Sequence, residues 1–215
     1  MPMAKAGGLA YLGPGRVQAV QLIGVDIERK CQDAAFRSGL LRQGAGESMP
    51  NMNLPPEAQA AARQALSKGG RVVREEDMPV GAILSIGLLA RPDDLTDEYP
   101  RDTLRGELTH WQQPVIITTG RRPEGGLHDA STGSLRQRLI CWPVDVVETG
   151  LHEADTHFVY VPFSAVYSLA GTTGPNQAPR GEALVQISLA EGVPVAKGVE
   201  IVRNAWRRAA MERNI

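Results

Sequence analysis

Short apolar and β-branched runs, each bounded by glycine, proline or a polar loop, fill the chain from Arg71 to Leu189. Runs of this length are typical of strands rather than of long helices with a sustained 3.6-residue period. The 23 glycines and 15 prolines are spread along the whole chain, which favours many short elements joined by turns. The pattern therefore predicts a β-rich core.

We predict strands, in chain order, at residues 15–25, 80–90, 103–111, 114–119, 136–148, 158–170 and 182–190. In the second of these runs, Gly81 and Gly87 indicate a β-bulge or the close approach of another segment. The last run alternates, so Val185, Ile187 and Leu189 share one face.

Three segments have helical patterns. Asp26 is a predicted N-cap, and apolar and small residues follow it at helical spacing up to Leu41. The alanine-rich run at 54–70 has Pro56 in its first turn and a glycine pair at its end. The third helix is amphipathic and covers residues 195–215. Its apolar stripe is formed by Val199, Val202, Trp206 and Ala209.

These elements predict an α+β fold: a small, mainly antiparallel sheet or partly open β-barrel of about six strands, with flanking helices and long loops. Within one domain we expect an extended N-terminal arm (1–14), a strand with two helices (15–70), a β-rich core (71–190) and a basic C-terminal helix (191–215). The loops at 91–102, 120–134 and 170–181 are long for such a domain, which suggests that they make contacts.

The net charge of −1 gives the chain as a whole no electrostatic signature of a nucleic-acid or anionic-membrane binder. Cys31 and Cys141 lie among apolar neighbours, so we expect buried free thiols and a reducing compartment. We find no leader-like opening and no run of 18 apolar residues. We therefore expect a cytoplasmic protein, or one in a particle assembled in the cytoplasm.

The heptapeptide LHEADTH, residues 151–157, is the densest group of chemically capable side chains. His152, Glu153, Asp155 and His157 offer metal ligands, yet the histidines are five residues apart and would face apart on a helix or a strand. We interpret the segment as a polar hairpin turn between two strands, and a metal site or a pH-sensing contact remains the alternative.

The loop GRRPEGGLHDASTG, from residue 120 to 133, contains Arg121 and Arg122 beside glycine-rich backbone. It lacks the endings of a phosphate-binding P-loop, and the chain contains no G-x-S-x-G nucleophile motif. We expect the two arginines to contact a neighbouring subunit or to bind an anion.

Two segments carry opposite charge. The acidic run at 92–102 includes Asp93, Asp94, Asp97 and Glu98, without the pattern of a calcium loop. The C-terminal helix is basic, with Arg203, Arg207 and Arg208 around Trp206. We hypothesise that the acidic run pairs with the basic helix of a neighbouring copy, in which case assembly weakens at high salt.

The segments LRGELTHWQQPVII and FVYVPFSAVYSL resemble the two short motifs of Sm-like RNA-binding barrels. The resemblance implies a small, strongly bent barrel that binds nucleic acid. Where that family has an aspartate, this chain has Gln112 or Gln113, and the segment between the two motifs is longer.

We find no specific catalytic constellation and predict no cofactor. The sequence favours a non-catalytic assembly subunit of a homo-oligomeric ring or larger particle, with arms and loops that contact neighbouring structural proteins. Phage head and tail proteins share this design, and the suggestion of a virion component rests on that analogy. The alternatives are an Sm-like nucleic-acid-binding barrel and a metal-dependent hydrolase centred on residues 152–157.

Overall fold

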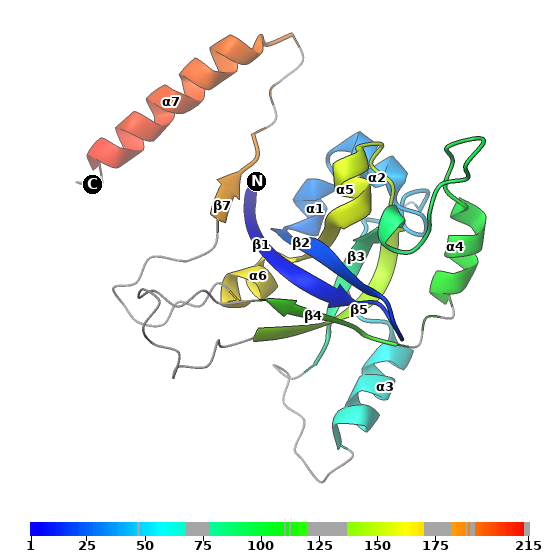
Figure 1. Ribbon diagram of the computed structural model, residues 1–215. Helices are drawn as coiled ribbons and strands as arrows, with labels where there is room; N and C mark the ends of the chain where they lie inside the picture. Colours follow the sequence, from blue (N-terminus) through cyan, green and yellow to red (C-terminus); the bar gives the residue numbers. More distant parts are fainter. Residues whose placement is uncertain are drawn as a thin grey trace, which may run out of the picture. The chain divides into compact units, whose positions relative to one another are not determined.

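A computed structural model describes residues 1–46, 48–67, 78–109, 111, 113–119, 137–169, 182–187, 189 and 192–212. The chain divides into two compact units, Met1–Val185 and Gln186–Ile215. The first unit contains a β-barrel with surrounding helices, and the second contains one long helix (Figure 1).

Six strands form a closed, mixed barrel. Around the ring their order is β1, β2, β6, β3, β5, β4, and β4 pairs again with β1. The β2–β6 and β3–β5 pairs are parallel and the other four are antiparallel. A seventh strand, β7, pairs with the N-terminal half of β1. The strands are β1 (Pro2–Tyr11), β2 (Val17–Val25), β3 (Val80–Ser85), β4 (Val115–Thr119), β5 (Gln137–Val147), β6 (Phe158–Pro162) and β7 (Glu182–Val185).

Helices flank this barrel, which confirms the predicted α+β fold with a six-stranded barrel. Its complete closure and its two parallel pairs go beyond the prediction. The helices are α1 (Ile27–Lys30), α2 (Ala34–Gly39), α3 (Pro56–Ser67), the 3₁₀ helix η2 (Ile86–Leu88), α4 (Arg101–Thr109), α5 (His152–His157), α6 (Phe163–Leu169) and α7 (Val195–Glu212).

The barrel interior is filled by one face of every strand. From β1 this face contributes only small side chains, since Ala4, Gly8 and Ala10 alternate along it. A Cβ atom on Gly8 would lie 3.0 Å from Cγ2 of Ile117, so a side chain of the neighbouring strand β4 already occupies that space. The other interior residues are larger and include Leu22, Leu84, Ile117, Val159 and Val161. Small residues on one strand and branched ones on the others fit a narrow barrel.

A second apolar cluster lies on the outside of the barrel. Phe36 and Leu40, at α2, pack with Ile23, Ile83 and Tyr160 of three adjacent strands. The rings of Phe36 and Tyr160 meet edge to face, with 5.0 Å between their centroids. One patch of the outer barrel surface is thereby shielded from water, while the rest of β1 and β2 exposes Leu9, Tyr11 and Val17.

The predicted helix from Ile27 to Leu41 is two short helices. Asp26 caps α1 by accepting a hydrogen bond from the Arg29 amide, as predicted. Asp33 then caps α2 by accepting from the Ala35 and Phe36 amides. The second cap explains the break, because an aspartate in this role takes a non-helical backbone conformation.

Glycines at 81 and 87 mark close approaches, as predicted. A Cβ atom on Gly81 would lie 1.9 Å from the carbonyl oxygen of Met52, and one on Gly87 would lie 2.7 Å from that of Asp155. A register shift between Ala82 and Ile83 is the predicted bulge. The strand ends at Ser85, however, and η2 follows it.

Residues 103–111 were expected to be a strand, but most of them form α4. Leu104 and Leu108 are both buried and four residues apart, which is the spacing of one helical face. The first segment that resembles an Sm-like motif is therefore helical where that family has a strand.

The predicted strand at 158–170 is a strand followed by a helix. It changes at Pro162, which has no backbone N–H to donate to a sheet. The predicted hairpin at 148–158 is also wrong, because LHEADTH forms α5 and β5 and β6 are separated by β3. At the start of the chain, most of the segment expected to be an extended arm is β1, paired along its length with β2.

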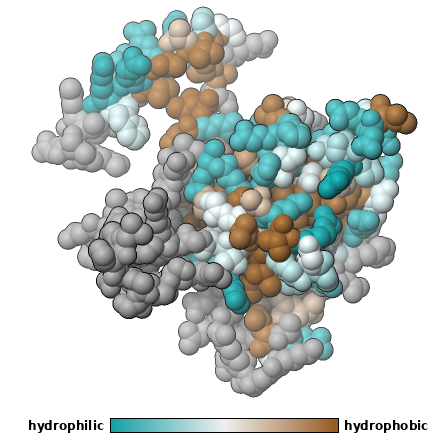
Figure 2. Space-filling view, in the orientation of Figure 1, coloured by the Kyte–Doolittle hydropathy of each residue, from teal (hydrophilic) through white to brown (hydrophobic). Residues whose placement is uncertain are grey.

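The second unit consists of α7 and the segment that leads to it. Gly198 faces Leu189, whose Cδ2 atom would lie 2.5 Å from an added Cβ. Most of the helix is exposed, including Val195, Val199 and Trp206, and Figure 2 shows apolar residues along it in brown. None of the helices in the described part of the chain combines the length and the hydrophobicity that a transmembrane helix requires.

Candidate functional site

The candidate metal ligands of α5 do not converge. Asp155 is buried, and its carboxylate accepts hydrogen bonds from the Thr149 amide at 2.6 Å, the Thr149 hydroxyl at 2.8 Å and the Gly150 amide at 2.9 Å. Glu153 is exposed, as are His152 and His157. Among the described residues, no three His, Cys, Asp or Glu side chains are grouped so that they could hold a metal ion. Asp155 therefore orders the turn before α5.

A second buried carboxylate, Asp145, secures the segment after α2. It accepts hydrogen bonds from the backbone amides of Arg42 at 3.0 Å, Gln43 at 2.9 Å and Val146 at 2.7 Å. Burial raises the pKa of Asp145, and these amide donors act in the opposite direction. The arrangement fastens Arg42 and Gln43 to the end of β5, which is a structural role.

Both cysteines are buried free thiols, as predicted. Burial raises the pKa of the Cys141 thiol to about 12 and also raises that of Cys31. Because the thiolate is the nucleophilic form, neither side chain is activated for chemistry at neutral pH.

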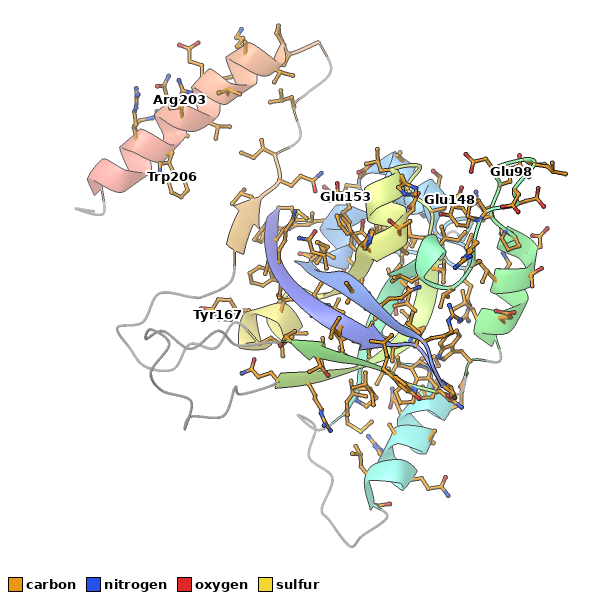
Figure 3. All side chains as sticks on the ribbon, in the orientation of Figure 1. Glu98, Glu148, Glu153, Tyr167, Arg203 and Trp206 are labelled. Atoms are coloured by element: carbon orange, nitrogen blue, oxygen red, sulfur yellow. The ribbon has the colours of Figure 1, made fainter. Side chains whose placement is uncertain are left out.

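The acidic run forms an ordered turn before α4. The Asp93 carboxylate accepts hydrogen bonds from the amides of Leu95 at 2.9 Å and Thr96 at 3.0 Å, and these bonds lower its pKa. The turn is closed by hydrogen bonds from the Asp97 amide to the Asp93 carbonyl oxygen and from the Asp93 amide to the Glu98 carbonyl oxygen, each at 2.9 Å, and Asp97 has a positive φ of 57°. As a result, Asp93, Asp94, Asp97 and Glu98 are all exposed at the surface, and Figure 3 labels Glu98 there.

Two arginines anchor α4 to the rest of the barrel unit. Arg101 pairs with Glu148 at 3.3 Å, and Arg105 donates from Nε to the Leu41 carbonyl oxygen at 2.8 Å. Arg105 also pairs with Asp102 at 3.3 Å, although the Asp102 side chain remains 96% exposed. The helix thus continues the acidic surface of the preceding loop through Asp102 and Glu107.

Beside α4 lies an open pocket with a volume of about 790 Å³. It lies between the helix and the turn that joins β1 to β2. Arg16 holds that turn in position by donating to the carbonyl oxygens of Leu88 at 2.9 Å and Leu89 at 3.3 Å. The lining residues are Leu12, Gly13, Pro14, Arg16, Asp102, Thr103, Gly106, Glu107, Trp111 and Gln113.

The pocket has an apolar side and an acidic side. Leu12, Pro14 and Trp111 are the apolar part of its lining, and the Trp111 indole donates to the Gln113 carbonyl oxygen. Asp102 and Glu107 are the acidic part, and the basic residue of the lining, Arg16, already donates to the Leu88 and Leu89 carbonyl oxygens. Such a surface suits a ligand that combines an apolar or aromatic group with positive charge.

The basic residues predicted for interaction lie on α7. Arg203, Trp206, Arg207 and Arg208 are all exposed, and Figure 3 shows Arg203 and Trp206 projecting from the helix. Arg121 and Arg122 lie outside the described residues, so the predicted contact in their loop has no structural description.

The sequence does not predict this pocket, because the pattern of residues 103–111 predicts a strand where the structure has α4. Reading residues 103–111 as a strand separated Asp102 from Glu107, whereas the helix brings both to the pocket beside the β1–β2 turn. The signal that could have revealed it is the four-residue spacing of Leu104 and Leu108.

Comparison with known proteins assigns no family to this arrangement. No protein-family model matches the chain, and a search of curated proteins finds no significant match.

Proposed function

We propose that the protein is a non-catalytic assembly subunit that associates with copies of itself in a ring or a larger particle. The exposed amphipathic helix α7 is the observation that supports this function. Val195 is 73% exposed, Val199 is 49% exposed and Trp206 is 73% exposed, on a helix of 18 residues in a unit of its own.

An amphipathic helix is stabilised mainly by packing of its apolar face, so one that exposes this face needs a partner. Exposed apolar surface with polar borders is typical of protein–protein contacts. Three exposed apolar residues of the β1–β2 hairpin, Leu9, Tyr11 and Val17, add surface of the same kind to the barrel unit. A subunit with two such surfaces can join more than one neighbour, as a closed ring requires.

The basic residues of α7 do not by themselves favour nucleic acid as the partner. Arg203, Arg207 and Arg208 flank an apolar stripe, while binders of single strands combine basic grooves with several aromatic residues for stacking. Trp206 is the one aromatic residue of α7.

Light scattering coupled to size-exclusion chromatography tests the proposal on the full chain. We expect a mass of several subunits that increases with concentration until the assembly is complete. A mass of 23.2 kDa at every concentration would exclude the assembly function. A parallel titration with fluorescent single-stranded RNA distinguishes the nucleic-acid alternative, which requires tight binding that weakens with salt.

A further inference from the structure

We infer that α7 of one copy docks in the α4 pocket of a second copy, with Trp206 in the pocket and Arg203 beside Glu107. This inference rests on the proposed assembly function and identifies the two surfaces that meet.

The helix has the pattern of a segment that binds in a groove. Val195, Val199, Val202 and Trp206 follow one another at i, i+4, i+7 and i+11, which aligns them on one face. The stripe is about 17 Å long at 1.5 Å per residue. Trp206, at its C-terminal end, is the largest of the four side chains and the natural anchor.

The pocket has the size and lining for such an anchor. Its volume of about 790 Å³ exceeds what one indole needs, so neighbouring atoms of the helix can enter with it. Leu12, Pro14 and Trp111 offer apolar contacts to the indole. Tyr11 and Val17 of the same hairpin lie next to the turn in sequence and are exposed apolar residues.

The charges of the two surfaces are opposite. Between residues 93 and 107 the chain carries six acidic side chains and two arginines. Both arginines already contact groups of the barrel unit, Arg101 through Glu148 and Arg105 through Leu41 and Asp102. On α7, Arg203 lies one turn before Trp206 and Arg207 directly follows it. Inserting Trp206 would therefore bring arginine to the acidic side of the pocket.

Within the barrel unit, the end of β7 and the pocket lie at opposite ends of β1. In β7, Val185 pairs with Pro2, so the chain leaves the barrel unit at the N-terminal end of β1. The pocket lies at the opposite end of that strand, beside Leu12 and Pro14. The helix and the pocket belong to different units of the chain, and donor and acceptor surfaces on different parts of a subunit can join copies head to tail.

Charge reversal in the full chain tests the pairing. Glu107→Lys and Arg203→Glu each place like charges together, and we expect each to weaken self-association by about ten- to a hundredfold. Trp206→Ala should weaken it by about thirtyfold or more, since it removes the anchor. Glu153→Lys, an equal charge change on α5, is the matched control and should leave the mass unchanged.

Mixing the two charge variants separates docking between copies from docking within one. In an equimolar mixture, Lys at 107 of one variant meets Glu at 203 of the other, while the unmodified Glu107 and Arg203 meet at the next contact. We expect the mixture to regain the mass of the unmodified protein, measured by light scattering, and the double variant Glu107→Lys/Arg203→Glu to do so alone. Circular dichroism and thermal unfolding establish that each variant is folded.

Three results would overturn the inference. The first is unchanged association in folded Glu107→Lys and Arg203→Glu, which leaves the assembly function intact but with other contacts. The second is recovery in the double variant without recovery in the mixture, which indicates docking within one chain. The third is loss of RNA binding in Arg203→Glu without a change in mass, which assigns the helix to nucleic acid. A monomeric unmodified protein would instead remove the proposed function itself.

Discussion

At the scale of single residues, the ionisable groups described in the barrel core serve structure. Asp145 and Asp155 each accept hydrogen bonds from neighbouring backbone amides, so both carboxylates already have hydrogen-bond partners. Cys141 is fully buried in the barrel interior. These groups show why a polar or reactive residue type in the sequence is weak support for a catalytic role. The role of such a side chain depends on its burial and on the hydrogen-bond partners that the fold supplies.

Removing the Asp145 carboxylate should destabilise the fold. Asp145→Ala leaves the amides of Arg42, Gln43 and Val146 without their acceptor in a buried place, and we expect a loss of about 2–4 kcal/mol in the free energy of unfolding. Urea unfolding measures this value. The exposed Asp94→Ala is the control and should change it by less than about 0.5 kcal/mol. Equal effects would show that Asp145 does not secure the segment.

Asp145 should also influence how stability depends on pH. Its pKa in the folded state is raised above the unfolded value of 3.8, so the folded state holds the proton more tightly. The contribution of Asp145 to stability is therefore full below pH 3.8 and decreases as the pH rises through the folded pKa. Asp145→Asn abolishes this titration, so unmodified protein should lose stability relative to the variant as the pH rises above about 4. Parallel unfolding curves across pH would contradict the assignment.

The two cysteines should be unreactive in the folded protein. Cys31 and Cys141 are buried, with raised pKa values, and a thiol reagent needs access to the thiolate. A colorimetric thiol assay should detect almost no reaction under native conditions and two equivalents per chain in denaturant. Rapid reaction of one equivalent in folded protein would show that one site opens.

At the scale of elements, single residues and residue pairs set boundaries that the average pattern of a run does not predict. Asp33 divides the first predicted helix, Pro162 ends β6, and the spacing of Leu104 and Leu108 makes α4 a helix. In each case a single residue or pair decides where an element begins or ends. Runs of five to ten residues are short enough for such local terms to prevail over the average propensity of the run.

Two glycines offer a direct test of element packing. Gly81→Ala would force a Cβ atom to 1.9 Å from the Met52 carbonyl oxygen, and we expect a loss of about 3 kcal/mol or more. Gly106 lies within α4 with no atom within 4 Å of an added Cβ, so Gly106→Ala should stabilise by up to about 1 kcal/mol. Chemical unfolding of the two variants gives both values. A mild effect at Gly81 would mean that the loop at Met52 shifts easily.

At the scale of the whole molecule, the protein combines a barrel unit that has its own core with a helical unit that exposes its apolar face. The barrel closes on itself, since β4 pairs with β1, which limits the strand edges open to other chains. The surfaces proposed for association are therefore side-chain surfaces: the α4 pocket, its acidic border and the stripe of α7.

Self-association should depend on salt if the acidic and basic surfaces meet. The residues concerned, such as Glu98, Asp102, Glu107 and Arg203, are exposed, and exposed charges are screened strongly when the Debye length falls from about 10 Å at 0.1 M salt to about 3 Å at 1 M. Sedimentation velocity at these two salt concentrations should show a smaller average mass at the higher one. Association that is equal at both would leave only the apolar contacts of Trp206 as its basis.

The sequence by itself determined the fold class and the local features of individual elements. It indicated an α+β chain with about six barrel strands, the Asp26 cap, the close approaches at Gly81 and Gly87, two buried thiols and a basic amphipathic helix at the end. These properties could be predicted because they depend on residues close together in the chain, through periodicity, capping and burial.

Only the tertiary structure decided the rest. Pro2–Tyr11 is a barrel strand because its alanines and glycines fit against large side chains of other strands, although its own composition suggested an arm. Likewise, the α4 pocket exists because closure of the barrel brings Leu12–Arg16 beside Asp102 and Glu107, about 90 residues later in the sequence. Contacts between distant segments follow from the shape of the whole core, which no local pattern records.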